Sequence, residues 1–359
     1  MKIDQAIVDK TGRALIERGA FLDDFHIEYL AQKGVNGIYI QEGDEEDPEE
    51  INAEIAALEK NMPKYTRELI EKERVEDRSK VTISESVKKQ VGEGVQYLFN
   101  NTNDDEHFAE STENVSKELM HAVLDNDAVA FDINMLKVSD EYTFKHSVDV
   151  ATVAMIIGKN YGLVRDQIHD IGVAGLLHDL GKTKIPGAVL NKPAKLDENE
   201  FALMKQHSLF GFQILKDKQE FNEDIMRGVL QHHEKINGSG YPLGVGATKI
   251  HTYAKIISVA DVYDALVTAR PYKSAFTARE AIEMIMAMTG DLEMKAMHSF
   301  LSSVVLYPVD SVVKLSNGEY CKVVKNDPAY ALRPTVVGMK TGRLYDLAND
   351  VKCTNLIIG

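Results

Sequence analysis

Histidine and aspartate are the side chains of this sequence whose type and spacing could do metal chemistry. Six of the eleven histidines fall between residues 146 and 233, and five of these lie beside polar or glycine-rich turns, namely His146, His178, His207, His232 and His233. His178 and Asp179 are adjacent, and neighbouring side chains on a helix point about 100° apart. They could therefore reach neighbouring metal ions only if the Asp179 carboxylate bridges the two ions, which suits a dinuclear site.

Two further segments carry candidate ligands. The segment HHEKINGSGYP at 232–242 places two consecutive histidines before a glycine-rich loop. Imidazole suits Fe, Mn, Zn or Ni, and added carboxylates shift the preference toward Fe or Mn. Asp261 lies in the apolar run ISVADVYDALV at 257–267, where an unpaired buried carboxylate would be costly. We therefore expect Asp261 either to coordinate metal or to form a buried salt bridge.

The segments around these residues predict a buried helical bundle. From 141 to 305 the sequence is helical and rich in apolar residues, as in VDVATVAMIIGKNYG at 148–162 and IHDIGVAGLLHDLGK at 168–182. Glycine is common just past the last turn of a helix. We therefore expect Gly162 and Gly181 to end these two helices.

The residues before the bundle are more polar. Residues 1–40 predict a small α/β module, with a helix that ends at Gly34 and a β-branched run, VNGIYI, at 35–40. The acidic segment QEGDEEDPEE at 41–50 is interpreted as a solvated loop. The pattern at 51–125 is helical and highly charged, which is typical of helices that bridge domains or pair with a second subunit.

The residues after Pro308 change to a β pattern. Alternating apolar residues flank Asn317 and Gly318, which predicts a β-hairpin, and the run NLIIG at 355–359 predicts a further strand. The expected fold class is mainly α, with a small α/β N-terminal module and a short C-terminal β appendage. The expected domains are a regulatory module with its connecting helices at 1–125, a catalytic domain at 126–310, and the appendage at 311–359.

Charge and composition exclude several classes of protein. The 359 residues carry 41 Lys+Arg and 56 Asp+Glu, a net charge of −15 that argues against a nucleic-acid polymer as partner. The excess is N-terminal, because residues 1–140 carry −16, residues 141–310 carry −2 and the remainder +3. The only two cysteines argue against a disulfide framework, and the sequence lacks an apolar run of ~20 residues, so we expect a cytoplasmic protein with no membrane segment.

Several of these motifs together resemble a known family. His178-Asp179 with Lys182 resembles the signature of the HD phosphohydrolase superfamily, and HHEKINGSGYP is similar to the element of its HD-GYP subgroup of cyclic di-GMP phosphodiesterases. The resemblance covers about 141–310 and implies an HD-type helical bundle. It implies that one metal is held by His146, His178, Asp179 and Asp261, and the other by Asp179, His207, His232 and His233.

The resemblance also implies residues that contact substrate. Lys182, Arg270 and Lys273 correspond to phosphate-gripping residues, and Tyr241 lies in the loop that names the subgroup. Some family members hold a third metal with a Glu one turn before the first His, but Tyr142 stands at that position here. We therefore expect two divalent cations, Fe or Mn, with Asp179 and Lys182 as the catalytic residues.

The expected function is hydrolysis of cyclic di-GMP to the linear dinucleotide pGpG by a hydroxide that bridges the two metals. The sequence leaves open whether hydrolysis continues to GMP. One alternative is hydrolysis of the hybrid cyclic GMP-AMP, because nothing in the sequence identifies the residues that read the bases. Another is a non-catalytic cyclic-dinucleotide sensor or interaction module. A homodimer through the N-terminal helices is a further expectation, and so is a signalling partner at the GYP loop, the loop that contains Gly240, Tyr241 and Pro242.

Overall fold

The computed structural model divides the chain into two compact units, residues 1–61 and 62–359. It describes residues 48–78, 80–81, 83–103, 107–124, 130–132, 144–192, 194–268 and 275–359, together with short strands before residue 48. In the first unit, β1 (Lys2–Ile3) pairs antiparallel with β4 (Ile40–Gln41) and β2 (Ile7–Val8) pairs antiparallel with β3 (Ala14–Ile16). Helix α2 (Pro48–Asn61) follows. The helix predicted before Gly34 lies outside the described residues.

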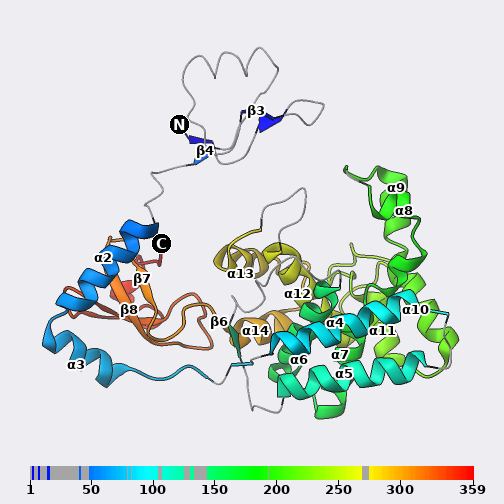
Figure 1. Ribbon diagram of the computed structural model, residues 1–359, viewed down its shortest axis with the longest axis horizontal. Helices are drawn as coiled ribbons and strands as arrows, with labels where there is room; N and C mark the ends of the chain where they lie inside the picture. The colour runs from blue at the N-terminus through cyan, green and yellow to red at the C-terminus, as the bar shows by residue number, and fades with distance from the viewer. Residues whose placement is uncertain are drawn as a thin grey trace. The chain divides into compact units, whose positions relative to one another are not determined.

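The second unit is mainly helical, as predicted (Figure 1). Its helical elements are α3 (Lys64–Glu73), α4 (Glu85–Asn100), α5 (Phe108–Leu124), α6 (Lys145–Tyr161), α7 (Arg165–Leu177), η2 (Leu180–Lys184), α8 (Gly187–Leu190), α9 (Glu198–Met204), α10 (His207–Lys218), α11 (Glu223–Gln231), α12 (Thr252–Val267), α13 (Ala278–Ala287), α14 (Met294–Ser303) and η3 (Val351–Cys353). In the part of the chain that is described, no helix is both long and apolar enough to cross a membrane.

Helix α6 lies at the centre of the bundle. It contacts α7, α12 and α14, and every residue from 147 to 158 is buried. Its last residue is Tyr161, and Gly162 follows directly with a φ of +96°, the left-handed conformation that glycine adopts without strain. The predicted end of this helix is confirmed, and α6 gives the site a rigid buried support.

The predicted end of the next helix is wrong. Helix α7 ends at Leu177, and Gly181 lies four residues later in the 3₁₀ turn η2. A Cβ atom on Gly181 would lie 1.9 Å from the backbone oxygen of His207. Glycine is therefore required here because η2 and α10 approach each other closely, and not because a helix ends.

Helices α4 and α5 pack on the bundle. Val91, Val95 and Leu98 of α4 and Phe108 and Leu119 of α5 are buried in the same apolar core as α6 and α7. The apolar faces of these two charged helices are therefore covered within the chain. The domain limits at 125 and 310 stay predictions.

The C-terminal residues form a small antiparallel sheet. Its strands β7 (Val312–Lys314), β8 (Tyr320–Lys325), β9 (Thr335–Gly338) and β10 (Leu344–Asp346) are ordered β10-β9-β8-β7, with α3 against β8 and β9. The hairpin between β7 and β8 turns at Gly318, with a φ of +83°, as predicted. The predicted strand at 355–359 is wrong, since this end makes only one bridge, between Ile358 and Leu315.

Two parallel strands, β5 (Phe131–Asp132) and β6 (Val304–Val305), join the segment before α6 to the end of α14. The guanidinium of Arg74, just after α3, pairs with Asp310 at 2.8 Å, just before β7. The sheet is thus tied to α3 by side-chain contacts as well as by packing.

Candidate metal centre

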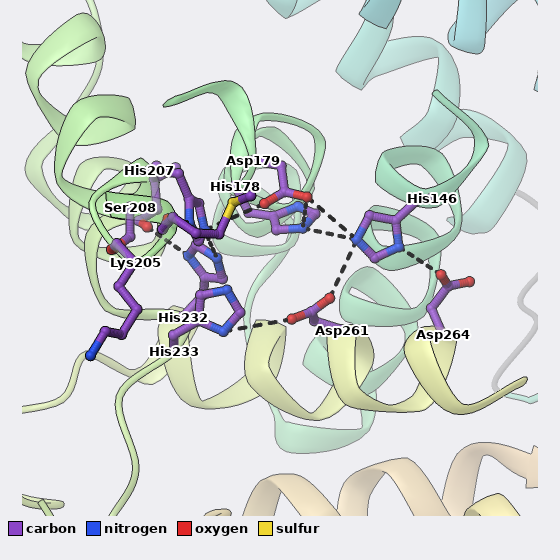
Figure 2. Close-up of polar contacts among 12 residues, drawn as sticks. His146, His178, Asp179, Lys205, His207, Ser208, His232, His233, Asp261 and Asp264 are labelled. Atoms are coloured by element: carbon purple, nitrogen blue, oxygen red, sulfur yellow. Dashed lines mark hydrogen bonds and ion pairs between the residues drawn. The ribbon is translucent and has the colours of Figure 1, made fainter. Parts of the chain in front are cut away.

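Helix ends converge on one buried cluster (Figure 2). His178 follows the last residue of α7, His232 follows the last residue of α11, and His207 is the first residue of α10. His146 lies in the first turn of α6 and Asp261 in the middle of α12. All seven ligands predicted from the sequence meet here, namely His146, His178, Asp179, His207, His232, His233 and Asp261.

The candidate ligands form two groups. His146, His178 and Asp179 make one, and His207, His232 and His233 make the other, with ligand atoms within 4.8 Å of one another in each. Asp261 lies between the groups in Figure 2, with Oδ1 3.3 Å from His146 Nε2 and Oδ2 3.9 Å from His233 Nδ1. Two ions could therefore be held side by side.

Asp179 faces both groups. Its Oδ2 lies 3.4 Å from His178 Nε2 and 3.6 Å from His146 Nε2, whereas its Oδ1 lies 3.5 Å from His207 Nε2. One carboxylate oxygen is therefore directed toward each group. This is the arrangement that a bridging carboxylate requires.

Three of the histidines are held in one tautomer. The Nδ1–H of His178 donates to Gly175 O at 2.7 Å, that of His207 to Met204 O at 2.8 Å, and that of His232 to Val229 O at 2.7 Å. Each acceptor lies three residues earlier, among the carbonyls that the end of a helix leaves without an intrahelical partner. With the proton on Nδ1, the lone pair of each ring is on Nε2.

These Nε2 atoms face other Nε2 atoms. His207 and His232 approach to 3.2 Å through Nε2, and so do His146 and His178. Facing lone pairs repel unless a proton or a metal cation lies close to both. Burial lowers the pKa of His207, and burial and the neighbouring His233 lower that of His232 well below its usual range, so this pair does not take a proton at neutral pH. The pair therefore fits a divalent cation.

His146 differs because carboxylates surround it. Burial lowers its pKa, but hydrogen bonds to Asp261 and Asp264 outweigh burial and raise the pKa to about 10. Burial likewise raises the pKa of Asp179, but Lys182 and then His178 outweigh it and hold that pKa well below its usual range. Burial also raises the pKa of Asp261, but the hydrogen bond to His146 and the charges of the neighbouring histidines outweigh it and hold that pKa well below its usual range. Both carboxylates are therefore ionised and negative charge is available for cations.

The predicted substrate contacts are only partly described. Lys182 Nζ lies 2.5 Å from Asp179 Oδ2, and the Tyr241 ring lies 4.7 Å from the His233 ring. Lys182 and Tyr241 therefore border the cluster. Arg270, Lys273 and Tyr142 lie outside the described residues.

Two carboxylates next to the cluster were missed by the sequence analysis. Asp264 accepts a hydrogen bond from His146 Nδ1 at 2.6 Å, and Glu234 accepts three backbone N–H groups of the loop after Tyr241. Asp264 lies three residues after Asp261 on α12, so the argument from a costly buried carboxylate applied to it as well. Glu234 had only its position beside two histidines as a signal.

The region that holds this cluster is similar to known proteins. Residues 131–294 match the family model described as HD domain. The chain is 35% identical over 219 residues to the Cyclic di-GMP phosphodiesterase PA4108 of Pseudomonas aeruginosa, covering 61% of this chain and 53% of that protein. It is 33% identical over 153 residues to the 3'3'-cGAMP-specific phosphodiesterase 1 of Vibrio cholerae, covering 42% and 35% respectively.

Among solved structures, the chain is similar to Bd1817, a HDG"Y"P protein from Bdellovibrio bacteriovorus. The TM-score is 0.50 at 18% sequence identity, over 84% of this chain and 94% of that chain. This likeness concerns the fold and confirms the helical bundle predicted from the sequence. The chain spans about half the length of the Pseudomonas relative and about a third of the Vibrio relative.

Proposed function

On the premise that the chain belongs to the HD domain family through residues 131–294, we propose that it is a metal-dependent phosphodiesterase that hydrolyses cyclic di-GMP to the linear dinucleotide. The name of the Pseudomonas relative supports this substrate. The observation that carries the proposal is the pair of facing, buried Nε2 atoms of His207 and His232. Beside them, the two oxygens of Asp179 are directed toward different histidines, Oδ1 toward His207 and Oδ2 toward His178.

We assign two divalent cations, iron or manganese, to the cluster. One would be held by His146, His178, Asp179 and Asp261, and the other by Asp179, His207, His232 and His233. Such a pair of ions would supply Lewis acidity to the phosphodiester and lower the pKa of water. The mixed imidazole and carboxylate donor set favours iron or manganese.

The chain's own residues would orient the substrate. The Lys182 side chain is about one-third exposed and its ammonium lies against Asp179, so the ammonium can turn to a non-bridging phosphate oxygen as a charge-assisted donor. Arg270 and Lys273 are assigned to the same task on their motif alone. Tyr241, at the border of the cluster, is assigned to the substrate as well.

A second candidate substrate is the hybrid cyclic GMP-AMP. The name of the Vibrio relative favours it, and metal ions that act on the phosphodiester would not distinguish guanine from adenine. A dimer through the N-terminal helices, a signalling partner at the GYP loop, the extent of hydrolysis beyond pGpG and a cytoplasmic location stay predictions.

The test is turnover by the full chain loaded anaerobically with iron or manganese, with cyclic di-GMP and cyclic GMP-AMP supplied separately and the products separated by chromatography. We expect linear product from cyclic di-GMP, none with Asp179→Ala, and full turnover with the control Asp166→Ala, an exposed aspartate on α7. Faster turnover of the hybrid would assign that substrate instead. Binding of a cyclic dinucleotide without hydrolysis after metal loading would point to a sensor. Unimpaired turnover by Asp179→Ala would contradict the assignment of Asp179 as the carboxylate that bridges the two metal ions.

A further inference from the structure

His233 is oriented differently from the other four histidines of the cluster. The rings of His178, His207 and His232 each have an Nδ1 hydrogen bond to a backbone carbonyl, and that of His146 has one to Asp264. Among the described residues, no hydrogen bond reaches the ring of His233, and its nearest carboxylate oxygen is 3.9 Å away, which is too long for a hydrogen bond.

The His233 ring, which has no such hydrogen bond in the described part of the chain, packs against the ring of Tyr241. The ring centroid of Tyr241 lies 4.7 Å from that of His233 at an interplanar angle of 32°, and the His232 ring lies 4.1 Å from it at 45°. Such tilted, offset ring pairs stabilise their geometry by about 0.5–1.5 kcal/mol. The Tyr241 N–H also donates to the His233 carbonyl at 3.2 Å, so ring and backbone both connect the two residues.

The loop that carries Tyr241 is fixed by the buried carboxylate of Glu234. Glu234 is only 4% exposed and has no ion-pair partner within the described ranges. Its Oε1 accepts the N–H groups of Leu243 at 2.6 Å and Gly244 at 3.2 Å, and its Oε2 accepts that of Val245 at 3.1 Å. Because the acceptor is charged, each of these bonds is stronger than a neutral one.

Close backbone packing fixes the distance between the same loop and the segment that contains His233. A Cβ atom on Gly240 would lie 2.3 Å from Lys235 N and 2.5 Å from His233 O. The loop therefore runs directly over the segment that bears the two consecutive histidines. A shift of the loop must move the Tyr241 ring relative to His233.

We propose that Glu234 and Tyr241 are positioning residues for His233: Glu234 holds the loop at 243–245, and the Tyr241 ring orients the imidazole in place of a hydrogen bond. The inference rests on the proposed function, because it takes His233 as a metal ligand. It gives the GYP loop a role inside the cluster, and it assigns that role to the tyrosine ring and not to its hydroxyl.

The test is a calorimetric titration of the metal-free full chain with Mn²⁺. We expect two binding steps in the wild type and in Tyr241→Phe, which keeps the ring. We expect Tyr241→Ala to weaken one step by about 10–100-fold, the effect typical of residues that orient a ligand, and to leave the other unchanged. Glu234→Gln should weaken the same step, and the double variant should lose less than the two single losses combined, because both act through His233.

The matched control is Glu223→Gln, an exposed glutamate on α11 that pairs with Arg227. It should leave both steps unchanged. Equal weakening by Tyr241→Phe and Tyr241→Ala would overturn the inference, since the hydroxyl would then be the active group. Wild-type affinities in Tyr241→Ala would overturn it as well.

A second measurement needs no metal. The imidazole ¹⁵N and ¹³C signals of His233 should be single in the metal-free wild type and in Tyr241→Phe, and should broaden or double in Tyr241→Ala and Glu234→Gln. Unchanged His233 signals in those two variants would contradict the inference. A chain that binds two Mn²⁺ ions and hydrolyses neither dinucleotide would contradict the proposed function alone, so the two failures can be told apart.

Discussion

Replacing Asp149 by asparagine should stabilise the metal-free protein at alkaline pH. Asp149 lies on α6, one turn after His146, and is 4% exposed. Burial, and next the nearby Asp264 carboxylate, raise its pKa to about 7, although Lys145 and Lys88 act in the opposite direction. An acid with a raised pKa keeps its proton longer in the folded state than in the unfolded state. Stability is therefore lost as the pH rises from about 4 to about 7.

The size of the effect follows from the two pKa values. At 1.36 kcal/mol per pH unit, a folded pKa of about 7 against an ordinary 3.8 costs about 4 kcal/mol once the pH exceeds both. At pH 5 only about 1.6 kcal/mol of that cost is present, because the unfolded chain is ionised and the folded Asp149 is not. Between pH 5 and pH 8 the wild type should lose about 3 kcal/mol through this residue. Asparagine has a similar size and does not ionise, so the variant should lose none of it.

The assay is urea unfolding of the wild type and Asp149→Asn at pH 5 and pH 8, with a chelator present throughout. The control is Asp166→Asn, since Asp166 is exposed on α7 and its substitution should leave the pH dependence of the wild type unchanged. We expect the free energy of unfolding of Asp149→Asn to exceed that of the wild type by about 3 kcal/mol more at pH 8 than at pH 5. Equal pH dependence of the two proteins would refute the reasoning.

Three further predictions concern the cluster. Asp264→Asn removes the charge behind His146 and should lower Mn²⁺ affinity about 10–100-fold in a titration at fixed pH; an unchanged affinity would mean that Asp264 does not orient the ring. Gly181→Ala forces a Cβ onto the His207 backbone and should cost about 3 kcal/mol in urea unfolding, whereas Gly187→Ala, which has space, should be close to neutral; equal costs would show that the contact relaxes. Adding free Mn²⁺ at a hundred times its dissociation constant to the metal-free protein, with the chelator removed, should raise the free energy of unfolding in urea by about 2.7 kcal/mol per site. An unchanged unfolding midpoint would argue against binding by the folded state.

The candidate site was largely predictable because its residues carry their own signals. The adjacency of His178 and Asp179 indicated a bridge, and the structure directs the two oxygens of Asp179 toward different histidine groups. What joined His146 and Asp261 to them was the resemblance to a family, since spacing along the chain does not fix which helix ends meet. Asp264 was missed although it shares an apolar helix with Asp261.

The fold was predictable where apolar residues dominate the sequence. It was less predictable where many charged residues surround a narrow apolar face of a helix. Helices α4 and α5 look polar by composition, yet Val91, Val95 and Leu98 recur at helical spacing and are buried against the bundle. Gly181 was taken as the end of a helix because the approach of α10 to η2 is a long-range contact that no local pattern contains. The run at 355–359 has the composition of a strand but makes a single bridge.

The central claim is that Asp179 joins two cations within one histidine cluster. The most direct measurement is anomalous scattering from crystals of the full chain saturated with Mn²⁺, with data collected on both sides of the manganese absorption edge. We predict two peaks, one beside His146 and His178 and the other beside His207 and His232, with one oxygen of Asp179 on each. A single peak, or two peaks without Asp179 between them, would contradict the account.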